Sequence, residues 1–315
     1  MASGPGKAVT YGLFGALAGK ATGKAPPAAT RRAGAGPTGG KKTAAAIKYG
    51  PPSNDYVKVR DGYVVAYDRR MRTARWVAEH LTRDSLYPKY GPGEKKPHRR
   101  ECMFAEDKSV PSKFRSKLED YRGSGYDRGH LSPAADHKTS QLGMCESFLL
   151  SNISPQVGKG FNRDYWARLE GFMRHLTKEY DDVYVLTGPA WVPEIDAVTG
   201  KAFVRYEVIG SPPNVAVPTH FFKAVLAETK DGRKRAVGAF LTPNAPIAEN
   251  EPLIKYSVSL DELERLIGLE LFPRAALASG VRSGGRGVVP LCDDTKCELP
   301  PPWSPPPKKN KSSSA

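Results

Sequence analysis

Four consecutive residues, Asp127-Arg128-Gly129-His130, place a carboxylate, a guanidinium, a glycine and an imidazole in one short run. An arginine can hold the charge of a phosphate, a histidine can act as a base near neutral pH, and a glycine lets backbone come close. These residue types therefore indicate chemistry on a phosphate. The alternative is a polar strand end whose Asp127 and Arg128 pair on the surface beside a bystander histidine, and these four residues alone leave both open.

Residues farther along the chain extend this chemistry. Asn152, Asn162 and Glu170 follow the run, and amide oxygens suit a single hard cation such as Mg²⁺ that keeps most of its waters. The sequence has neither the cluster of carboxylates that a two-metal nuclease needs nor a Cys/His set for zinc. The pattern favours a site with one weakly held metal.

The elements that must position these side chains are two strands and a helix. A strand is predicted over the opening run and a buried strand over residues 147–156, which breaks at Pro155. A helix of about four turns is predicted after Asn162, because apolar residues there recur at helical spacing: Trp166, Leu169, Phe172, Met173 and Leu176. A hairpin followed by a helix can bring His130, Asn152 and Asn162 together.

The rest of the chain predicts an α+β fold with a central antiparallel sheet flanked by helices. Residues 56–67 alternate around Asp61-Gly62, which predicts a hairpin, and a short helix is expected over Arg75–Leu81. Strands are predicted over residues 183–188, 202–209, 215–226 and 236–241, and Asp231-Gly232 predicts another hairpin turn. Because these strands are closely spaced with few helices between them, an antiparallel sheet is favoured. A helix over 260–269 is predicted from a capping box of Ser259 and Glu262.

Residues 82–100 are rich in Pro, Gly and basic side chains, which predicts an irregular loop. The loop ends in His98-Arg99-Arg100, a group of candidate phosphate contacts. The commoner outcome for such a cluster is a solvated patch.

The two ends of the chain differ in composition from its middle. Net charge is +15, and residues 1–54 hold eight Lys or Arg with no acid in an Ala/Gly/Pro-rich segment. We expect residues 1–46 to be a mitochondrial targeting segment, 47–298 a single domain, and 299–315 a Pro/Lys/Ser-rich solvated tail. Alternatives for the first segment are a secretory signal over residues 8–19 or a basic arm that binds nucleic acid. The run over 8–19 is too short for a membrane span.

Four cysteines are too few for a disulfide framework in a chain of 315 residues. Cys102 and Cys145 are expected to be reduced thiols. Cys292 and Cys297 would form a local disulfide in an oxidising compartment or simply mark a structured end to the fold.

Several motifs resemble, in order, the DNA/RNA non-specific endonuclease family with its ββα-metal (His-Me) finger. They are Asp127-Arg128-Gly129-His130, then Ser151-Asn152-Ile153-Ser154-Pro155-Gln156, then Asn162 and Trp166-Ala167-Arg168-Leu169-Glu170. Supporting stretches include Ile47-Lys48-Tyr49-Gly50, Tyr121–Tyr126, Ala216–Lys223 and Pro243–Pro246. The likeness runs from about residue 47 to 275, and within the family it is greatest to the mitochondrial endonuclease G type.

The resemblance implies a role for each site residue. His130 would be the general base, Asn162 the direct protein ligand of Mg²⁺ (with Mn²⁺ as an alternative ion), and Arg128 the phosphate clamp. Glu170 would act through metal-bound water, and Arg100 and Asn152 would contact substrate. Asp127, Gly129 and Gln156 would support the site. The products would carry 5′-phosphate and 3′-hydroxyl ends.

Rival readings remain for some of these residues. Glu170 could pair with Arg174 on a solvated helix face, and Asn162 could be only a helix N-cap. Asn152 and Gln156 could merely brace the site. Gly158-Lys159-Gly160-Phe161 makes the link to Asn162 one residue longer than is usual in the family.

The resemblance implies DNA and RNA as partners through their backbones, a homodimer, and no membrane span. It implies a mitochondrial location, in the intermembrane space or at the inner membrane, with relocation to the nucleus. The sequence shows no base-reading motif such as a zinc finger, which agrees with recognition of the phosphate backbone. The alternatives are a nucleic-acid-binding protein with an inactive nuclease fold and a phosphodiesterase for a small substrate.

Overall fold

The computed structural model describes residues 56–273 and 288–302. The expected targeting segment over 1–46 lies outside the described residues, as does the motif at Ile47–Gly50. Of the expected tail, only residues 299–302 are described.

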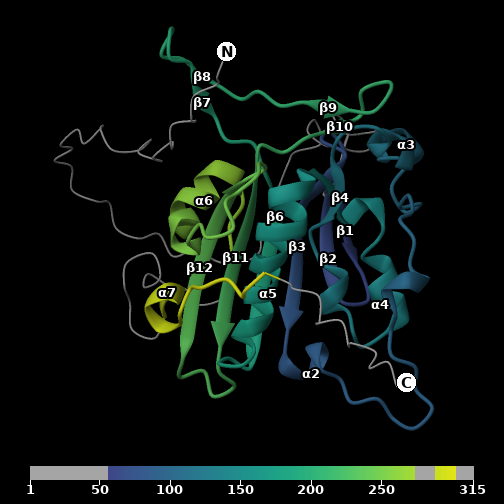
Figure 1. Cartoon of the computed structure of the whole chain (residues 1–315), viewed down its shortest axis with the longest axis vertical. Helices are drawn as coiled ribbons and strands as arrows, with labels where there is room; N and C mark the ends of the chain where they lie inside the picture. Colours follow the sequence, from purple (N-terminus) through teal and green to yellow (C-terminus); the bar gives the residue numbers. More distant parts are fainter. Residues whose placement is uncertain (1–55, 274–287, 303–315) are drawn as a thin grey trace, which may run out of the picture. The chain divides into compact units, whose positions relative to one another are not determined.

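The core of the described fold is a mixed sheet with strand order β1-β2-β3-β6-β11-β12-β13, to which β14 is added beside β12 (Figure 1). Every pairing is antiparallel except that of β14 with β12. This confirms the predicted α+β class with a central antiparallel sheet. The strands are β1 Tyr56–Val59, β2 Tyr63–Asp68, β3 Thr73–Leu81, β6 Asp182–Ala190, β11 His220–Glu228, β12 Arg235–Pro243, β13 Ser257–Val258 and β14 Val289–Pro290.

Two hairpin turns follow from short Asp-Gly sequences, as predicted. The turn between β1 and β2 contains Asp61 and Gly62, and Gly62 has a φ of 132° that other residues rarely adopt. The turn between β11 and β12 contains Asp231 and Gly232, where Asp231 Oδ1 accepts hydrogen bonds from Thr229 Oγ1 and the Arg233 amide. The local sequence of each turn therefore favours the pairing of the two strands that it joins.

Residues 75–81 were expected to form a helix, and that prediction is wrong. They belong to β3, which is hydrogen-bonded to β2 on one side and to β6 on the other. Val77, Glu79 and Leu81 alternate on the buried face. The apolar pattern of so short a run is compatible with either a helix or a strand. Hydrogen bonding to β2 and β6 decides that it is a strand.

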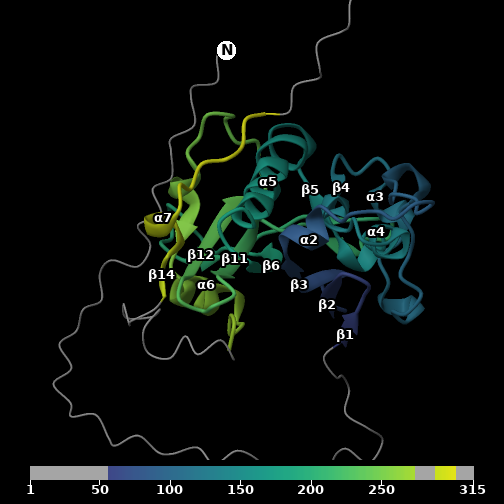
Figure 2. The same cartoon turned by 90° about the horizontal axis from the view of Figure 1, so that it is seen from below.

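The two faces of the sheet are covered by different helices (Figure 2). On one face lies α5, Ala167–Leu176, which continues from the wider turns of η5, Gly158–Trp166. Trp166 at the end of η5 and Leu169 and Phe172 of α5 pack against the strands. On the other lies α6, Leu260–Ile267, with the predicted capping box of Ser259 and Glu262. The helix after Asn162 is thus confirmed, although Lys159 and Gly160 are not helical.

Short elements connect these layers. The helical ones are α2 Arg83–Leu86, η1 Arg99–Glu101, η2 Ser112–Phe114, α3 Leu118–Tyr121, η3 Ala134–Asp136, α4 Gln141–Glu146, η4 Leu150–Asn152, η6 Leu253–Tyr256 and α7 Leu291–Asp294. The short strands are β4 Asp127–His130, β5 Ile153–Gln156, β7 Glu194–Ile195, β8 Ala202–Phe203, β9 Val208–Ile209 and β10 Val215–Ala216.

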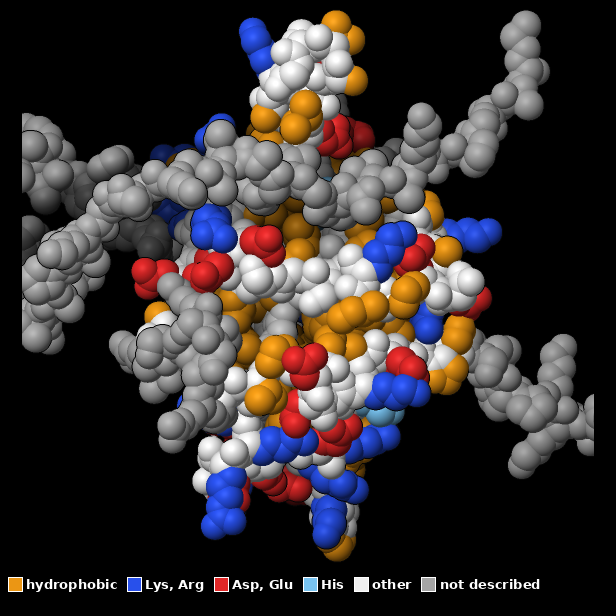
Figure 3. All heavy atoms as spheres, turned by 90° about the vertical axis from the view of Figure 1, so that its left-hand side faces the viewer, with side chains coloured by type: hydrophobic (Ala, Val, Ile, Leu, Met, Phe, Trp, Pro, Cys, Tyr) orange, Lys and Arg blue, Asp and Glu red, His pale blue; other side chains and the backbone are white. Residues whose placement is uncertain are grey.

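Three predicted strands differ from expectation. Residues 215–226 divide into β10, which pairs with β9, and β11, which begins at His220. Residues 202–209 form only β8 and β9, and the hairpin β7–β8 stands out from the sheet (Figure 1), with apolar side chains at its surface (Figure 3). Residues 147–152 are not a strand, because the backbone turns through η4 before β5 begins at Ile153. Pro155 lies within β5 rather than ending it, opposite Arg128.

All four cysteines are paired, so the expectation of reduced thiols at Cys102 and Cys145 is wrong. A disulfide joins Cys102, just after η1, to Cys145 in α4, and a second joins Cys292 to Cys297. Only the fold brings Cys102 and Cys145 together, since 43 residues separate them.

The start of the expected solvated tail packs on the domain. Leu299 contacts the main core, and the Pro300 carbonyl accepts a hydrogen bond of 2.6 Å from Arg168 Nε. Within 56–273 and 288–302, every helix is too short or too polar to cross a bilayer.

Candidate active site

The candidate site is built on two antiparallel strands and the helix that follows them. β4 pairs with β5 so that Asp127 lies opposite Gln156 and His130 opposite Ile153. The chain then continues into η5 and α5. In Figure 2, β4, β5 and α5 lie side by side. This strand–strand–helix unit is the predicted ββα arrangement.

The imidazole of His130 lies in an aromatic box. Its ring centre is 5.4 Å from that of Phe104 and 4.7 Å from that of Phe148, whose ring meets it edge-on. Burial lowers the pKa of His130 from 6.5 to about 3, and the positive charge of Arg99 acts in the same direction. Its Nε2 atom is buried with no hydrogen-bond partner among the described residues. His130 is therefore neutral near neutral pH.

Asp127 fixes the side chain of Asn162. Its Oδ2 atom accepts a hydrogen bond of 2.9 Å from Asn162 Nδ2, and Arg163 makes a two-point ion pair with the same carboxylate. These hydrogen bonds from Arg163 and Asn162 lower the pKa of Asp127. With its amide nitrogen held in this way, Asn162 has its Oδ1 atom left over, and nothing described donates to it.

The free amide oxygen fits a hard divalent cation, for which oxygen is the preferred ligand. In the described part of the chain, no three His, Cys, Asp or Glu side chains are close enough to hold a metal. A cation at this site would therefore have Asn162 as its main protein ligand and water for the rest.

Gly129 leaves room for the side chain of Gln156. A Cβ atom at Gly129 would lie 1.9 Å from Gln156 Oε1, and Gln156 is fully buried, so its amide has little room to move. The expected role of Gly129 was to let backbone come close. The structure shows instead that the glycine admits a neighbouring side chain from β5.

Two arginines flank the histidine box. The guanidinium of Arg128, an exposed residue, lies 4.4 Å from the centre of the Phe104 ring, and that of Arg99 lies 5.5 Å from the centre of the Phe148 ring. Arg100, the sequence-based candidate, is exposed on η1, where its amide donates to His98 Nδ1, and among the described residues it contacts none of the site. The sequence offered Arg99 only as one member of the cluster His98-Arg99-Arg100 and assigned the substrate contact to Arg100, whereas the structure puts Arg99 beside the box.

Glu170 is half-buried among charged side chains, Lys223, Arg174 and Asp136, rather than on a fully solvated helix face. Burial raises the pKa of Glu170 to about 7, although Lys223 and Arg174 oppose that shift. Arg174 donates instead to Asp136, at 2.8 Å. The alternative of a surface Glu170–Arg174 pair is therefore wrong.

Asn152 has no exposed surface, and its amide is fully engaged with backbone. Its Oδ1 accepts from the Ser132 amide at 3.0 Å, and its Nδ2 donates to the carbonyls of Ser132 and Ser147, each at 2.8 Å. The Ser132 hydroxyl in turn contacts Glu79 and His137. Substrate could reach Asn152 only if these bonds broke, so this residue braces the turn after His130.

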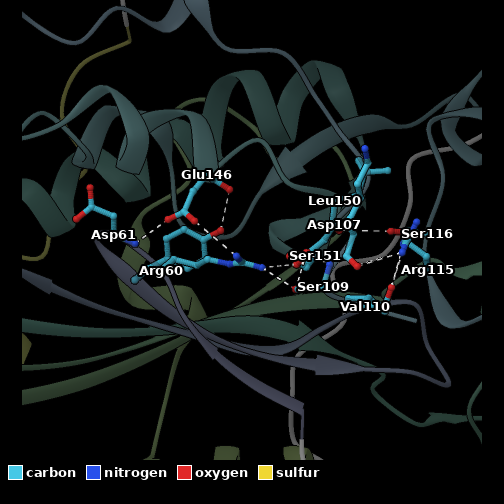
Figure 4. Close-up of polar contacts among 12 residues, drawn as sticks. Arg60, Asp61, Asp107, Ser109, Val110, Arg115, Ser116, Glu146, Leu150 and Ser151 are labelled. Atoms are coloured by element: carbon cyan, nitrogen blue, oxygen red, sulfur yellow. Dashed lines mark hydrogen bonds and ion pairs between the residues drawn. The ribbon is translucent and has the colours of Figure 1, made fainter. Parts of the chain in front are cut away.

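The loop that carries Phe104 is anchored by a polar network (Figure 4). Asp107 accepts hydrogen bonds from Arg60 at 2.6 Å and from Ser151 at 2.7 Å, which links the first hairpin to η4. Arg60 also pairs with Glu146 of α4, at 3.5 Å. Together with the disulfide of Cys102, this network fixes the aromatic wall beside His130.

Comparisons with known proteins agree with this geometry. A profile of the family described as DNA/RNA non-specific endonuclease matches residues 40–277. The chain is 47% identical over 258 residues to the mitochondrial nuclease of Saccharomyces cerevisiae, covering 80% of this chain and 74% of that one. It is 44% identical over 233 residues to mitochondrial endonuclease G of Homo sapiens, covering 74% and 75%.

A solved structure supports the same conclusion. In a crystal structure of an EndoG/EndoGI complex, one chain superposes with a TM-score of 0.65 at 43% identity, covering 74% of this chain and 91% of that one. Its fold, the family profile and the relatives all match the chain that carries the ββα unit described above. The chain belongs to the DNA/RNA non-specific endonuclease family and is an endonuclease similar to the mitochondrial endonuclease G proteins.

Proposed function

We propose that this endonuclease is Mg²⁺-dependent and hydrolyses the phosphodiester bonds of both DNA and RNA, leaving 5′-phosphate and 3′-hydroxyl ends. The observation that carries the proposal is a neutral, buried His130 on the same short strand as Asp127, whose carboxylate holds the amide of Asn162. A buried neutral imidazole is a suitable general base, and an oriented amide oxygen is a suitable ligand for Mg²⁺.

Each residue has a separate part in this mechanism. His130 takes the proton from the attacking water through the part of its ring that stays accessible, since the side chain is neutral and 9% exposed. Arg128 holds the phosphate and its added negative charge, and we assign a similar part to Arg99 in place of Arg100. Bound at Asn162, Mg²⁺ (or Mn²⁺) would stabilise the charge that develops on the phosphate and on the leaving oxygen. Glu170, two turns along the helix from Asn162, orients water near that position.

Digestion of plasmid DNA and of RNA tests this proposal. Wild type should cut both polymers with Mg²⁺ and neither with EDTA. His130→Ala and Asn162→Ala should each lose at least about a hundredfold in rate, the usual scale for removal of a general base. His175→Ala, a matched change of an exposed histidine on α5, should cut like wild type.

Two outcomes would contradict the proposal in different ways. If wild type leaves both polymers intact with metal present, the alternative of an inactive nuclease fold that only binds nucleic acid is correct. If His130→Ala cuts as fast as wild type, the chain is a nuclease with another base.

The proposed location is the mitochondrion, in the intermembrane space or at the inner membrane, with relocation to the nucleus. Two observations support it: the names of the relatives and the acid-free basic composition of residues 1–46. Fractionation of cells that express the full chain tests both compartments.

The proposed assembly is a homodimer. The projecting β7–β8 segment exposes apolar side chains that an interface would cover, including Ile195 at 53% and Val198 at 93% exposure. Light scattering should give twice the chain mass of 34.3 kDa, and a value near that of one chain would refute the dimer.

A further inference from the structure

A pocket of about 370 Å³ lies beside the finger, between α3 and the start of β4. The two elements are neighbours in both Figures 1 and 2. Its lining combines aromatic, aliphatic and charged side chains: Leu118, Tyr121, Arg122, Tyr126, Asp127 and Arg128. Because Arg128 borders both the pocket and the histidine box, a group in the pocket would be adjacent to a phosphate held for cleavage.

The aromatic wall of the pocket is held in place. Tyr126 is half-buried, packs with the small core around Tyr121 and Ile209, and donates its hydroxyl to Glu207 at 2.8 Å. The turn that leads to it is fixed by Ser124, whose hydroxyl accepts from the Tyr126 amide and donates to the Tyr121 carbonyl. The ring of Tyr126 therefore has one orientation before any ligand arrives, which reduces the entropy cost of binding.

The pocket also has a net positive charge. Within the described residues, no carboxylate forms an ion pair with Arg122 or Arg128, whereas the nearby Asp127 carboxylate is neutralised by Arg163. Two uncompensated guanidinium groups thus lie beside an aromatic wall. A planar aromatic group joined to an anion would satisfy both features, and a nucleotide is such a ligand.

The geometry points to a subsite for one nucleotide of the bound strand, next to the scissile phosphate, with its base against Tyr126 and its own phosphate on Arg122. This inference rests on the proposed function, because it assumes a nucleic acid positioned by Arg128. Base stacking is sequence-tolerant, since every base has an aromatic face. The subsite would let a non-specific nuclease bind a strand without selecting a particular base.

A thermodynamic cycle between protein and substrate tests the subsite. The substrate is a single-stranded oligonucleotide with one phosphodiester linkage, and all its other linkages are phosphorothioates. Two abasic versions of this substrate each lack the base on one side of the phosphodiester. Tyr126→Leu should raise KM roughly tenfold with little change in kcat, which is the scale of one lost base–aromatic stack. Removal of the base that occupies the pocket should cost wild type a similar factor but cost Tyr126→Leu almost nothing. Tyr126→Phe keeps the ring and should retain most of the affinity.

The role of Arg122 has a separate readout in salt. Arg122→Gln should flatten the slope of log KM against log salt concentration by about 0.7, as expected for one lost phosphate contact on a single strand. The matched controls are Arg233→Gln and Tyr87→Leu, which change an exposed arginine on the β11–β12 hairpin and an exposed tyrosine. Neither control should change KM.

Each outcome separates the subsite from the proposed function. If wild type fails to cut the single-linkage substrate with Mg²⁺, the proposed function is wrong. Two results with an active wild type would refute only the subsite, provided that circular dichroism shows Tyr126→Leu to be folded. One is a Tyr126→Leu variant with the wild-type KM. The other is a Tyr126→Leu variant that loses as much affinity as wild type when either neighbouring base is removed.

Discussion

At the scale of single residues, the site depends on how neighbours restrict two side chains. Phe104 and Phe148 exclude water from His130, so its imidazole stays neutral far below its usual pKa. Asp127 binds the amide nitrogen of Asn162 and leaves the oxygen for a ligand. Neither effect is a property of the histidine or the asparagine itself.

The support from Asp127 leads to a first prediction. Asp127→Ala should lower kcat/KM by about ten- to a hundredfold and raise the Mg²⁺ concentration required, because residues that orient a metal ligand commonly contribute that much. Steady-state cleavage at a series of Mg²⁺ concentrations measures both effects. Arg163→Gln removes only the exposed partner of the same carboxylate and should change activity less than threefold. Equal losses in the two variants would show that the ion pair, rather than the bond to Asn162, matters.

The burial of His130 predicts a pH dependence of stability. The pKa of this imidazole is about 3 in the folded chain and about 6.5 in the unfolded chain, so between these values the unfolded state binds one more proton. The fold therefore loses stability from this group as pH falls from 6.5 toward 3. Against His130→Asn, the free energy of unfolding of wild type should fall by about 1.4 kcal/mol more per pH unit between pH 6 and 4.

Urea unfolding in EDTA at several pH values measures this difference without a metal. Above pH 7 the difference between wild type and His130→Asn should be constant, because the group is neutral in both states. A constant difference over the whole range would show that His130 titrates normally in the folded chain.

At the scale of elements, the site is a junction between pieces held by different means. β4 and β5 are tied by ladder bonds, α5 is tied by its apolar face to the sheet, and the loop before α3 is tied by Asp107 and a disulfide. The loop carries Arg99 and Phe104, so its anchoring controls the wall of the histidine box. This is the element whose loss should affect both stability and catalysis.

The two disulfides should therefore differ in importance. Cys102→Ser/Cys145→Ser opens a loop of 43 residues and should lower the free energy of unfolding by up to about 4 kcal/mol in the chain-entropy picture. It should also raise KM, because Arg99 and Phe104 lose their fixed position. Cys292→Ser/Cys297→Ser opens a loop of 5 residues, for which the same picture gives about 2 kcal/mol, and should leave KM unchanged. Equal KM values for the two double variants would show that Asp107 alone anchors the loop.

At the scale of the whole molecule, the chain divides into a nuclease domain and ends of different composition. The family profile begins at residue 40, whereas the acid-free basic composition extends to residue 54. The site residues, from Arg99 to Glu170, lie within residues 56–273. We therefore expect the basic first segment to act in localisation rather than in catalysis.

Removal of residues 1–45 should abolish import into mitochondria and leave the rate of plasmid cleavage within about twofold of wild type in low salt. Import into isolated mitochondria and cleavage by the purified chain are the two measurements. Unchanged import would refute the targeting role. A large loss of cleavage by the truncated chain, with a changed dependence on salt, would instead support a nucleic-acid-binding arm. Contacts of basic side chains with phosphates weaken as the salt concentration rises.

The sequence by itself determined the features that depend on near neighbours in the chain. Asp-Gly pairs predicted two hairpin turns, Ser259 and Glu262 predicted the start of α6, and the order of Asp127–His130, Asn162 and Glu170 indicated a ββα unit. Only the tertiary structure decided that residues 75–81 form a strand, that Arg99 rather than Arg100 faces the histidine, and that Cys102 pairs with Cys145. It also decided that Glu170 is half-buried beside Lys223 and Arg174. The physical reason is that strand partners, burial and charge environment are set by residues far away in the sequence, which local patterns cannot identify.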